Sequence, residues 1–210
     1  MSRIFQPQYL QPPRGFTEPV VLDESPLCLE IGAGMGKHAL DFAAAHPDKR
    51  LFAIERTAAK FQAFAARAAV AELANLHPVH ADALPWVVHA LAPACLSEAF
   101  ILYPNPEPKN PAQRWLNMPF FAFLLSRLQP GATLTLASNI EAYIDEAEAQ
   151  LQTQWRLPYV REAVAAGRDR THFETKYLAR GESCQQLVLT KPEGYQTPFD
   201  AVIASAHRTR

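Results

Sequence analysis

Short apolar runs alternate along the middle of the chain with longer stretches of helical period. The runs have the length of strands, and they cover Leu27–Ile31, Leu51–Ile54, Leu76–His80, Ala99–Tyr103 and Thr133–Ala137. The segments between them predict helices. Regular alternation of strand and helix is typical of a parallel sheet with helices on its faces, so the pattern predicts an α/β fold.

Boundary signals support this interpretation and add two strands. Thr57 precedes an Ala-rich stretch and predicts a helix start, and the run 128–131, Leu-Gln-Pro-Gly, predicts a helix stop followed by a turn. Farther along, Thr171–Leu178 and Gln186–Thr190 predict strands joined by a short connection. We therefore expect a mostly parallel seven-stranded sheet with an antiparallel edge hairpin.

The two ends of the chain differ from its middle. The first 26 residues contain five prolines, which favour an extended arm over a helix. A length of 210 residues suits one domain. We expect an arm over residues 1–25, a single domain over 26–191 and a tail over 192–210. In the tail, Tyr195, Phe199 and Ile203 are expected to pack on the sheet.

Composition narrows the class of protein. Hydrophobic residues make up 49% and charged residues 20%, which excludes a largely disordered chain. The net charge of -1 gives no general basic excess, so contact with nucleic acid would depend on local clusters. Cys28, Cys95 and Cys184 are isolated, which predicts free buried thiols, no metal site and a reducing cytoplasm. With no run of signal-peptide or membrane-span length, we expect a soluble cytoplasmic protein without membrane partners.

Three glycines follow the first predicted strand. Gly32, Gly34 and Gly36 lie between that strand and a helix start, the order in which a cofactor lies over the turn. A dinucleotide-binding loop would have its third glycine at position 37, which is Lys37, so the spacing disfavours NAD. A Walker phosphate loop would need Ser or Thr where His38 stands.

Carboxylates end three successive strands. Glu30 is expected to orient the glycine loop or to reach a ligand amino group through water. Glu55, 19 residues past Gly36, can accept both hydroxyls of a ribose, and Asp82 can accept from an adenine amino group. Taken alone, Glu55 would be a solvated charge and Asp82 a helix N-cap. Together with the glycine loop they predict S-adenosylmethionine as cofactor, on a Rossmann-like methyltransferase fold.

The same segments resemble the tRNA (guanine-N7)-methyltransferase family. Its members carry LEIGxGxG, IE, DA, FPDP and TKFE; this chain has LEIGAGMG at 29–36, IE at 54–55, DA at 82–83, YPNP at 103–106 and THFE at 171–174. The resemblance covers about residues 26–191. It implies an S-adenosylmethionine-dependent enzyme that methylates a tRNA guanine, with Asn105, Thr171 and Glu174 as the catalytic residues around the base.

The chain departs from the family at two places. Asn105 replaces an aspartate, so one of two acceptor oxygens becomes an amide donor and fits the donor edge of guanine less well. The basic run that follows FPDP is replaced by Glu-Pro-Lys-Asn-Pro-Ala-Gln-Arg-Trp at 107–115, which should weaken tRNA binding and flatten its salt dependence. A second cluster, interpreted as a mixed solvated surface, combines Arg156, Arg161, Arg168, Arg170, Lys176 and Arg180 with Glu162, Asp169 and Glu174.

Three functions remain open at this level. The first is methylation of a tRNA guanine. The second is methylation of a small molecule or another nitrogen nucleophile, since Asn105-Pro106 is similar to the NPP[YF] element of amino-methyltransferases. The third is a non-catalytic protein that binds S-adenosylmethionine, against which the intact Glu30, Glu55 and Asp82 argue.

Overall fold

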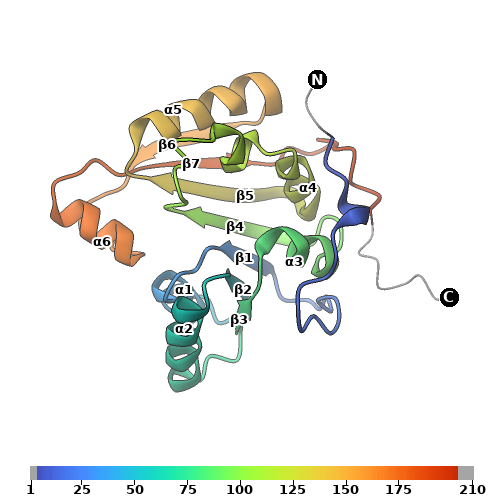
Figure 1. The fold of residues 1–210 in the computed structure, drawn as a ribbon, viewed down its shortest axis with the longest axis horizontal. Helices are drawn as coiled ribbons and strands as arrows, with labels where there is room; N and C mark the ends of the chain where they lie inside the picture. Colours follow the sequence, from blue (N-terminus) through green and yellow to red (C-terminus); the bar gives the residue numbers. More distant parts are fainter. Residues whose placement is uncertain (1–3, 203–210) are drawn as a thin grey trace.

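A sheet of seven strands lies between two layers of helices in the computed structural model, which describes residues 4–202 (Figure 1). The strand order is β3-β2-β1-β4-β5-β7-β6. Strands β1 to β5 pair in parallel, and β7 runs antiparallel to both of its neighbours. The strands are β1 Leu27–Ile31, β2 Arg50–Glu55, β3 Leu76–His80, β4 Leu96–Leu102, β5 Leu128–Ser138, β6 Tyr159–Ala163 and β7 Gln185–Thr190. The predicted α/β class, its parallel strands and its antiparallel edge are confirmed.

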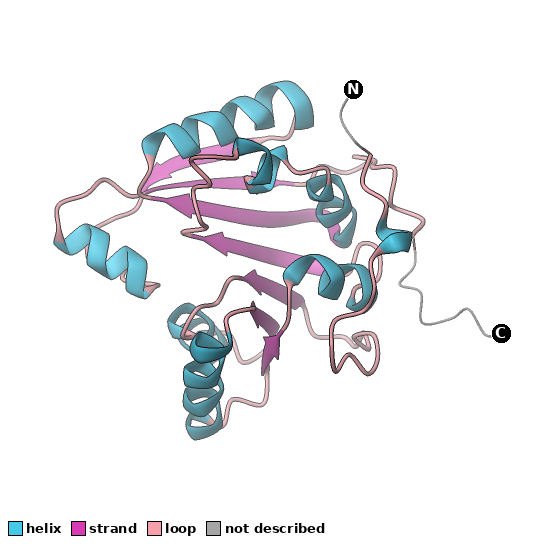
Figure 2. Ribbon diagram, viewed as in Figure 1, coloured by secondary structure: helices cyan, strands magenta, loops and turns pink. Residues whose placement is uncertain are grey.

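Helices cover both faces of the sheet (Figure 2). Alternate residues of β1 divide between two apolar clusters: Leu27, Leu29 and Ile31 pack with α3, α4 and α5, whereas Cys28 packs with α1 and α2. The α6 side chains join a third cluster with β4. The helices are α1 Lys37–Ala45, α2 Ala58–Ala71, α3 Ala83–Ala90, α4 Phe120–Arg127, α5 Glu141–Gln150 and α6 His172–Ala179.

One expectation from the sequence is wrong. The pattern predicts a strand over Thr171–Leu178, but this segment forms α6, and the strand that pairs with β7 is β6. Thr171 is the N-cap of α6 and its hydroxyl accepts the backbone N–H of Glu174 at 3.0 Å. Thr-x-x-Glu is a capping-box pattern, and this local signal outweighs the strand propensity of Thr, Phe and Tyr. The apolar pattern does not reveal β6, because it is a short edge strand that carries Arg161 and Glu162.

Two predicted boundaries lie where the sequence places them, but their local structure differs from the expectation. Thr57 is the N-cap residue of α2, yet its side chain makes no capping hydrogen bond. The turn at residues 129–131 lies inside β5 as an exposed irregularity, where the register with β4 shifts. The expected boundaries of these elements are therefore close to the observed ones, but the groups that fix them are not those the sequence suggests.

Both ends of the described chain pack on the α3 and α4 side. Phe5 of the arm contacts Phe120 and Phe199, with ring centroids 5.3 and 5.9 Å apart. The fully buried Arg127 guanidinium donates to the carbonyls of Leu91, Phe199 and Val202 at 2.9 Å each, which fastens the tail to α4. The expected packing of Tyr195 and Phe199 is confirmed, whereas Ile203 lies outside the described residues.

The described residues also bear on partners and cofactors. Within residues 4–202 no helix combines the length and apolarity needed to cross a membrane. No group of three or more His, Cys, Asp or Glu in that range could hold a metal ion. The three cysteines are free and buried, as predicted, and burial raises the pKa of Cys28 and of Cys95 to about 11, which keeps these thiols protonated.

Candidate active site

The glycine loop joins β1 to α1 at the point where the strand order reverses. After β1 the chain builds β2 and β3 on one side and then crosses to β4 on the other. Ligands of open α/β sheets bind at the carboxyl edge beside such a switch point. The loop is therefore at the position in the fold where a cofactor is expected.

The three glycines have different roles. Each has a positive φ, of 81° at Gly32, 60° at Gly34 and 81° at Gly36. A Cβ built on Gly32 or Gly34 would meet no heavy atom within 4 Å, so this stretch of backbone is open to a ligand. A Cβ on Gly36 would stand 2.0 Å from the ring of Phe64, a fully buried residue of α2. The third glycine thus serves close packing of α2 on the loop.

Glu55 ties the end of β2 to the glycine loop. Its carboxylate is buried, and the two oxygens accept the N–H of Gly34 at 2.9 Å and of Thr57 at 2.6 Å. Each carboxylate oxygen has a second lone pair, so these bonds leave acceptor capacity. The structure therefore keeps Glu55 in place with capacity to accept a ligand hydroxyl.

Glu30 and Asp82 flank this position on neighbouring strands. The buried Glu30 carboxylate accepts a hydrogen bond from His38 Nδ1 at 3.0 Å, which joins β1 to the first turn of α1. This contact favours the loop-orienting role over contact with a ligand. Asp82 is exposed and is the N-cap of α3, with one oxygen accepting the N–H of Leu84 at 2.9 Å. Its other oxygen forms no hydrogen bond within residues 4–202, so capping and ligand binding are compatible.

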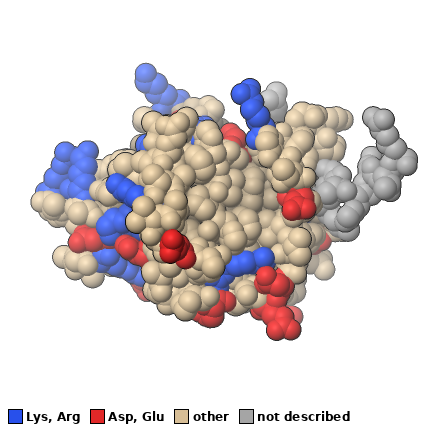
Figure 3. All heavy atoms as spheres, turned by 90° about the horizontal axis from the view of Figure 1, so that it is seen from below, with Lys and Arg blue, Asp and Glu red and all other residues tan. Residues whose placement is uncertain are grey.

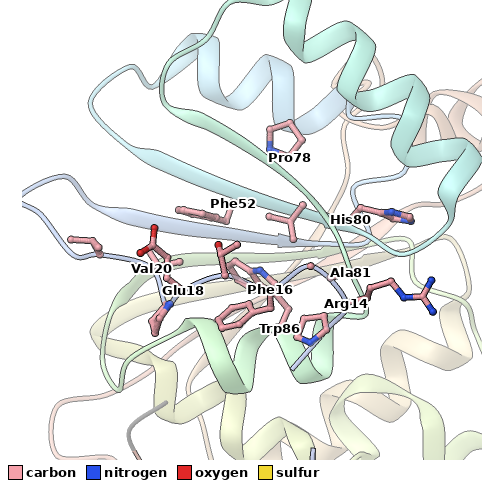
Figure 4. Close-up of a pocket in the computed structure, with 15 residues that line it drawn as sticks. Arg14, Phe16, Glu18, Val20, Phe52, Pro78, His80, Ala81 and Trp86 are labelled. Atoms are coloured by element: carbon pink, nitrogen blue, oxygen red, sulfur yellow. The ribbon is translucent and has the colours of Figure 1, made fainter. Parts of the chain in front are cut away.

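These residues fit S-adenosylmethionine. The open backbone at Gly32 and Gly34 leaves room for close approach of a ligand, and carboxylates end three adjacent strands at the same edge of the sheet. A cavity of about 470 Å³ lies between the arm and the β2–β3 part of the sheet (Figure 4); its lining reaches the carboxyl end of β3 at Ala81 but includes none of these glycines and carboxylates. Arg14 of the arm and Ala81, the residue directly before Asp82, both line this cavity. The arm thus lines the same cavity as the carboxyl end of β3.

Glu174 is the centre of a buried hydrogen-bond network. It is fully buried and accepts from the Tyr103 hydroxyl at 2.7 Å, from the backbone N–H of Arg170 at 2.9 Å and from the Arg170 guanidinium at 2.6 Å. Burial pushes the pKa of Glu174 upward, but the hydrogen bonds from Arg170 and Tyr103 outweigh it and hold this pKa below its usual value. The carboxylate is therefore ionised and its hydrogen-bonding capacity is largely used.

The structure brings two of the three predicted catalytic residues together. Thr171 and Glu174 share the first turn of α6. Asn105 follows β4 two residues after Tyr103, whose hydroxyl contacts Glu174, but in the described part of the chain Asn105 forms no hydrogen bond with Thr171 or Glu174. Its amide instead donates to Glu107 at 2.8 Å.

The start of α6 lies against the glycine loop. The Lys37 amine donates to the Asp169 carbonyl, which joins α1 to the segment before α6. Arg67 of α2 donates to the Met35 carbonyl and contacts His172, both at 3.2 Å. The region resembling the family's base site is therefore next to the expected cofactor site.

Several of these contacts have weak signals in the sequence. Tyr103 stands where the family has Phe, and a hydroxyl on a buried ring needs a polar partner. Arg170 lies four residues before Glu174, the spacing of an ion pair on a helix. Arg67 has no comparable signal, because its partners come from distant parts of the chain.

Charge is mixed over the surface near α6. Arg161 pairs with Asp145 and Glu148, and Arg170 pairs with Glu174. Among the described residues, no Asp or Glu lies within ion-pair distance of Arg156, Arg168 or Lys176. Figure 3 shows both signs of charge interspersed on the face seen from below. The interpretation of this cluster as a mixed surface agrees with these pairings.

A family model and curated relatives that match this chain are named as methyltransferases. The model of a family described as "Putative methyltransferase" matches residues 24–189. A tRNA (guanine-N(7)-)-methyltransferase of Nitrosomonas eutropha is 32% identical over 172 residues, which cover 80% of this chain and 77% of the relative.

Solved structures agree on the fold. The 16S rRNA methyltransferase KamB has a TM-score of 0.64 at 18% identity, covering 80% of this chain and 89% of its own. The O-methyltransferase TomG from Streptomyces achromogenes, in complex with SAM, has a TM-score of 0.57 at 18% identity, covering 80% of this chain and 74% of its own. The family model and the relative from Nitrosomonas eutropha show that the chain belongs to the tRNA (guanine-N7)-methyltransferase family of S-adenosylmethionine-dependent enzymes.

Proposed function

We propose that this enzyme transfers the methyl group of S-adenosylmethionine to N7 of a guanine in tRNA. The observation that carries the proposal is the open glycine loop held by Glu55, with the start of α6 directly beside it. The activity named for the Nitrosomonas eutropha relative supports the choice of acceptor. The buried free thiols are consistent with work in a reducing cytoplasm.

Each of the predicted cofactor-binding residues has its own role in holding the methyl donor. Gly32 and Gly34 let the backbone approach the methionine part of the donor, and Gly36 keeps the loop packed on α2. Glu55 accepts the ribose hydroxyls, Asp82 accepts from the adenine amino group, and Glu30 fixes the loop through His38. S-adenosylmethionine supplies an electrophilic methyl group when bound.

The acceptor side needs little acid–base chemistry. N7 of guanine carries a lone pair, so no proton has to leave before it attacks the methyl carbon. Catalysis is then mainly alignment of the nitrogen with the methyl group and the sulfur. We assign this alignment to Asn105 together with Thr171 and Glu174, the last through its position in the first turn of α6.

Bulk tRNA incubated with methyl-labelled donor tests the proposal directly. The expected product is 7-methylguanosine after digestion to nucleosides. Label in a small-molecule extract with none in tRNA would instead support a diverged acceptor. Donor binding without transfer to either pool would support a non-catalytic binding protein.

Replacement of Glu55 by Gln should weaken donor binding about tenfold to hundredfold, because one carboxylate oxygen becomes an amide donor that faces a backbone N–H or a ribose hydroxyl. Isothermal titration with S-adenosylmethionine measures the change. The matched control is Glu72→Gln, which removes an exposed charge at the end of α2 and should bind like the wild type. Equal affinities in all three proteins would contradict the assigned role of Glu55.

Salt dependence should reflect the absence of the basic run. The segment 107–115 supplies only Lys109 and Arg114, and Arg114 is held by Glu146. For each phosphate that the protein leaves unneutralised, the slope of log affinity against log salt becomes shallower by about 0.7 to 0.9. We therefore expect tRNA affinity to fall less steeply with salt than for a relative with the full run, in filter-binding assays of the two enzymes. Equal slopes would mean that other cations have replaced the run.

A further inference from the structure

The Asn105 amide is already paired through one of its two N–H groups. Its Nδ2 group donates to an oxygen of Glu107 at 2.8 Å. The second N–H and the carbonyl oxygen of Asn105 remain for a ligand, together with the second oxygen of the Glu107 carboxylate, so that two of these three groups are acceptors. The pair therefore supplies two acceptor oxygens, as many as the single aspartate that the family has at this place.

The loop holds the two side chains in place. Glu107 has a φ of 45°, a left-handed conformation that is strained for a non-glycine residue. The loop is fixed on both sides, since Arg114 Nε donates to the Pro106 carbonyl at 2.8 Å and Asn110 N–H donates to the Glu107 carbonyl at 3.2 Å. Prolines at 104, 106 and 108 alternate with the pair and restrict the backbone further.

Glu107 keeps its charge available. Its side chain forms no ion pair with a Lys or Arg within residues 4–202, and the residue is only partly buried. Glu174, the other carboxylate near this edge, is fully buried and already accepts from Tyr103 and Arg170. Of the two, Glu107 is the one with a free oxygen for an acceptor molecule.

We propose that Asn105 and Glu107 act as a composite acceptor pair that binds the donor edge of the methyl-accepting base, a ring N–H beside an exocyclic amine. Glu107 is then a specificity-determining residue. This inference rests on the proposed function for the choice of a guanine. The pair supplies the two acceptors that the substitution of Asn for Asp would otherwise have reduced to one.

An exchange of the two side chains tests the pair. Glu107→Gln replaces the free oxygen by an amide donor or breaks the bond to Asn105, and should raise KM for tRNA at least tenfold. Asn105→Asp places two carboxylates side by side and should have a similar effect. The double variant N105D/E107Q restores one amide facing one carboxylate and should return to within about threefold of the wild type. Glu193→Gln, an exposed change in the tail, is the control.

The outcomes separate this proposal from the proposed function. Guanosine and inosine, which lacks the exocyclic amine, are titrated by NMR against each protein saturated with demethylated donor. The wild type should bind guanosine about tenfold more tightly, and Glu107→Gln should lose the preference. Loss of the preference without 7-methylguanosine in tRNA would overturn the function but keep the pair. Methylation of tRNA with an unchanged preference in Glu107→Gln, or a double variant that does not recover, would overturn the pair.

Discussion

Gly36→Ala is expected to destabilise the enzyme by about 2–5 kcal/mol, the largest effect of any single change in the glycine loop. About 1–2 kcal/mol comes from placing a side chain at a φ of 81°. Another 1–3 kcal/mol, roughly, comes from overpacking, because the new methyl group would stand 2.0 Å from the Phe64 ring in the interface between the loop and α2. Urea denaturation followed by circular dichroism measures the change.

Gly34→Ala is the matched control for this effect. Its φ of 60° gives similar backbone strain, but a methyl group there meets no heavy atom within 4 Å. The expected stability loss is about 1–2 kcal/mol, while donor binding should suffer strongly because the methyl group projects into the open space over the loop. Equal stability losses in the two variants would show that Phe64 moves aside, and unchanged donor affinity in Gly34→Ala would place the ligand elsewhere.

The candidate cofactor site could be proposed from the sequence because its signals are local. Glycine spacing and strand-end carboxylates depend on strand and helix boundaries, which the apolar pattern gives directly. What the pattern cannot give is the second partner of each group: Phe64 behind Gly36, or His38 beside Glu30. These contacts depend on how helices pack on the sheet.

The site for the methyl acceptor is harder to predict, because its contacts also depend on how distant segments pack together. The family resemblance places Glu174 near the base. Its carboxylate, however, already accepts hydrogen bonds from Tyr103, which follows β4, and from Arg170 in the segment before α6. A strand over Thr171–Leu178 would not have the capping geometry that brings Arg170 to Glu174. Conversely, Glu107 looks in the sequence like part of a degraded basic run, and only its bond to Asn105 reveals a use for it.

Glu174→Ala is expected to lower the free energy of unfolding by about 3–5 kcal/mol, because it leaves the largely buried Arg170 guanidinium without its counterion. Tyr103→Phe removes only one hydrogen bond from the same carboxylate and should cost about 1 kcal/mol. Guanidinium denaturation gives both values, and hydrogen exchange should locate the loosening in α6. An Ala variant as stable as Tyr103→Phe would mean that the network contributes little.

The same network should make stability depend on pH in a defined direction. The pKa of Glu174 is lowered in the folded protein, so protonation favours the unfolded chain, whose carboxyl has the higher pKa of about 4.3. The stabilisation is complete above that value and is lost as the pH falls through the lower, folded pKa. The wild type and Glu174→Gln are denatured at pH 7 and at pH 3. The difference between their free energies of unfolding should be smaller at pH 3 than at pH 7. An equal difference at both pH values would show that the charge of Glu174 does not stabilise α6. A lower kcat/KM in Glu174→Gln, with unchanged stability, would indicate instead that Glu174 contacts the base directly.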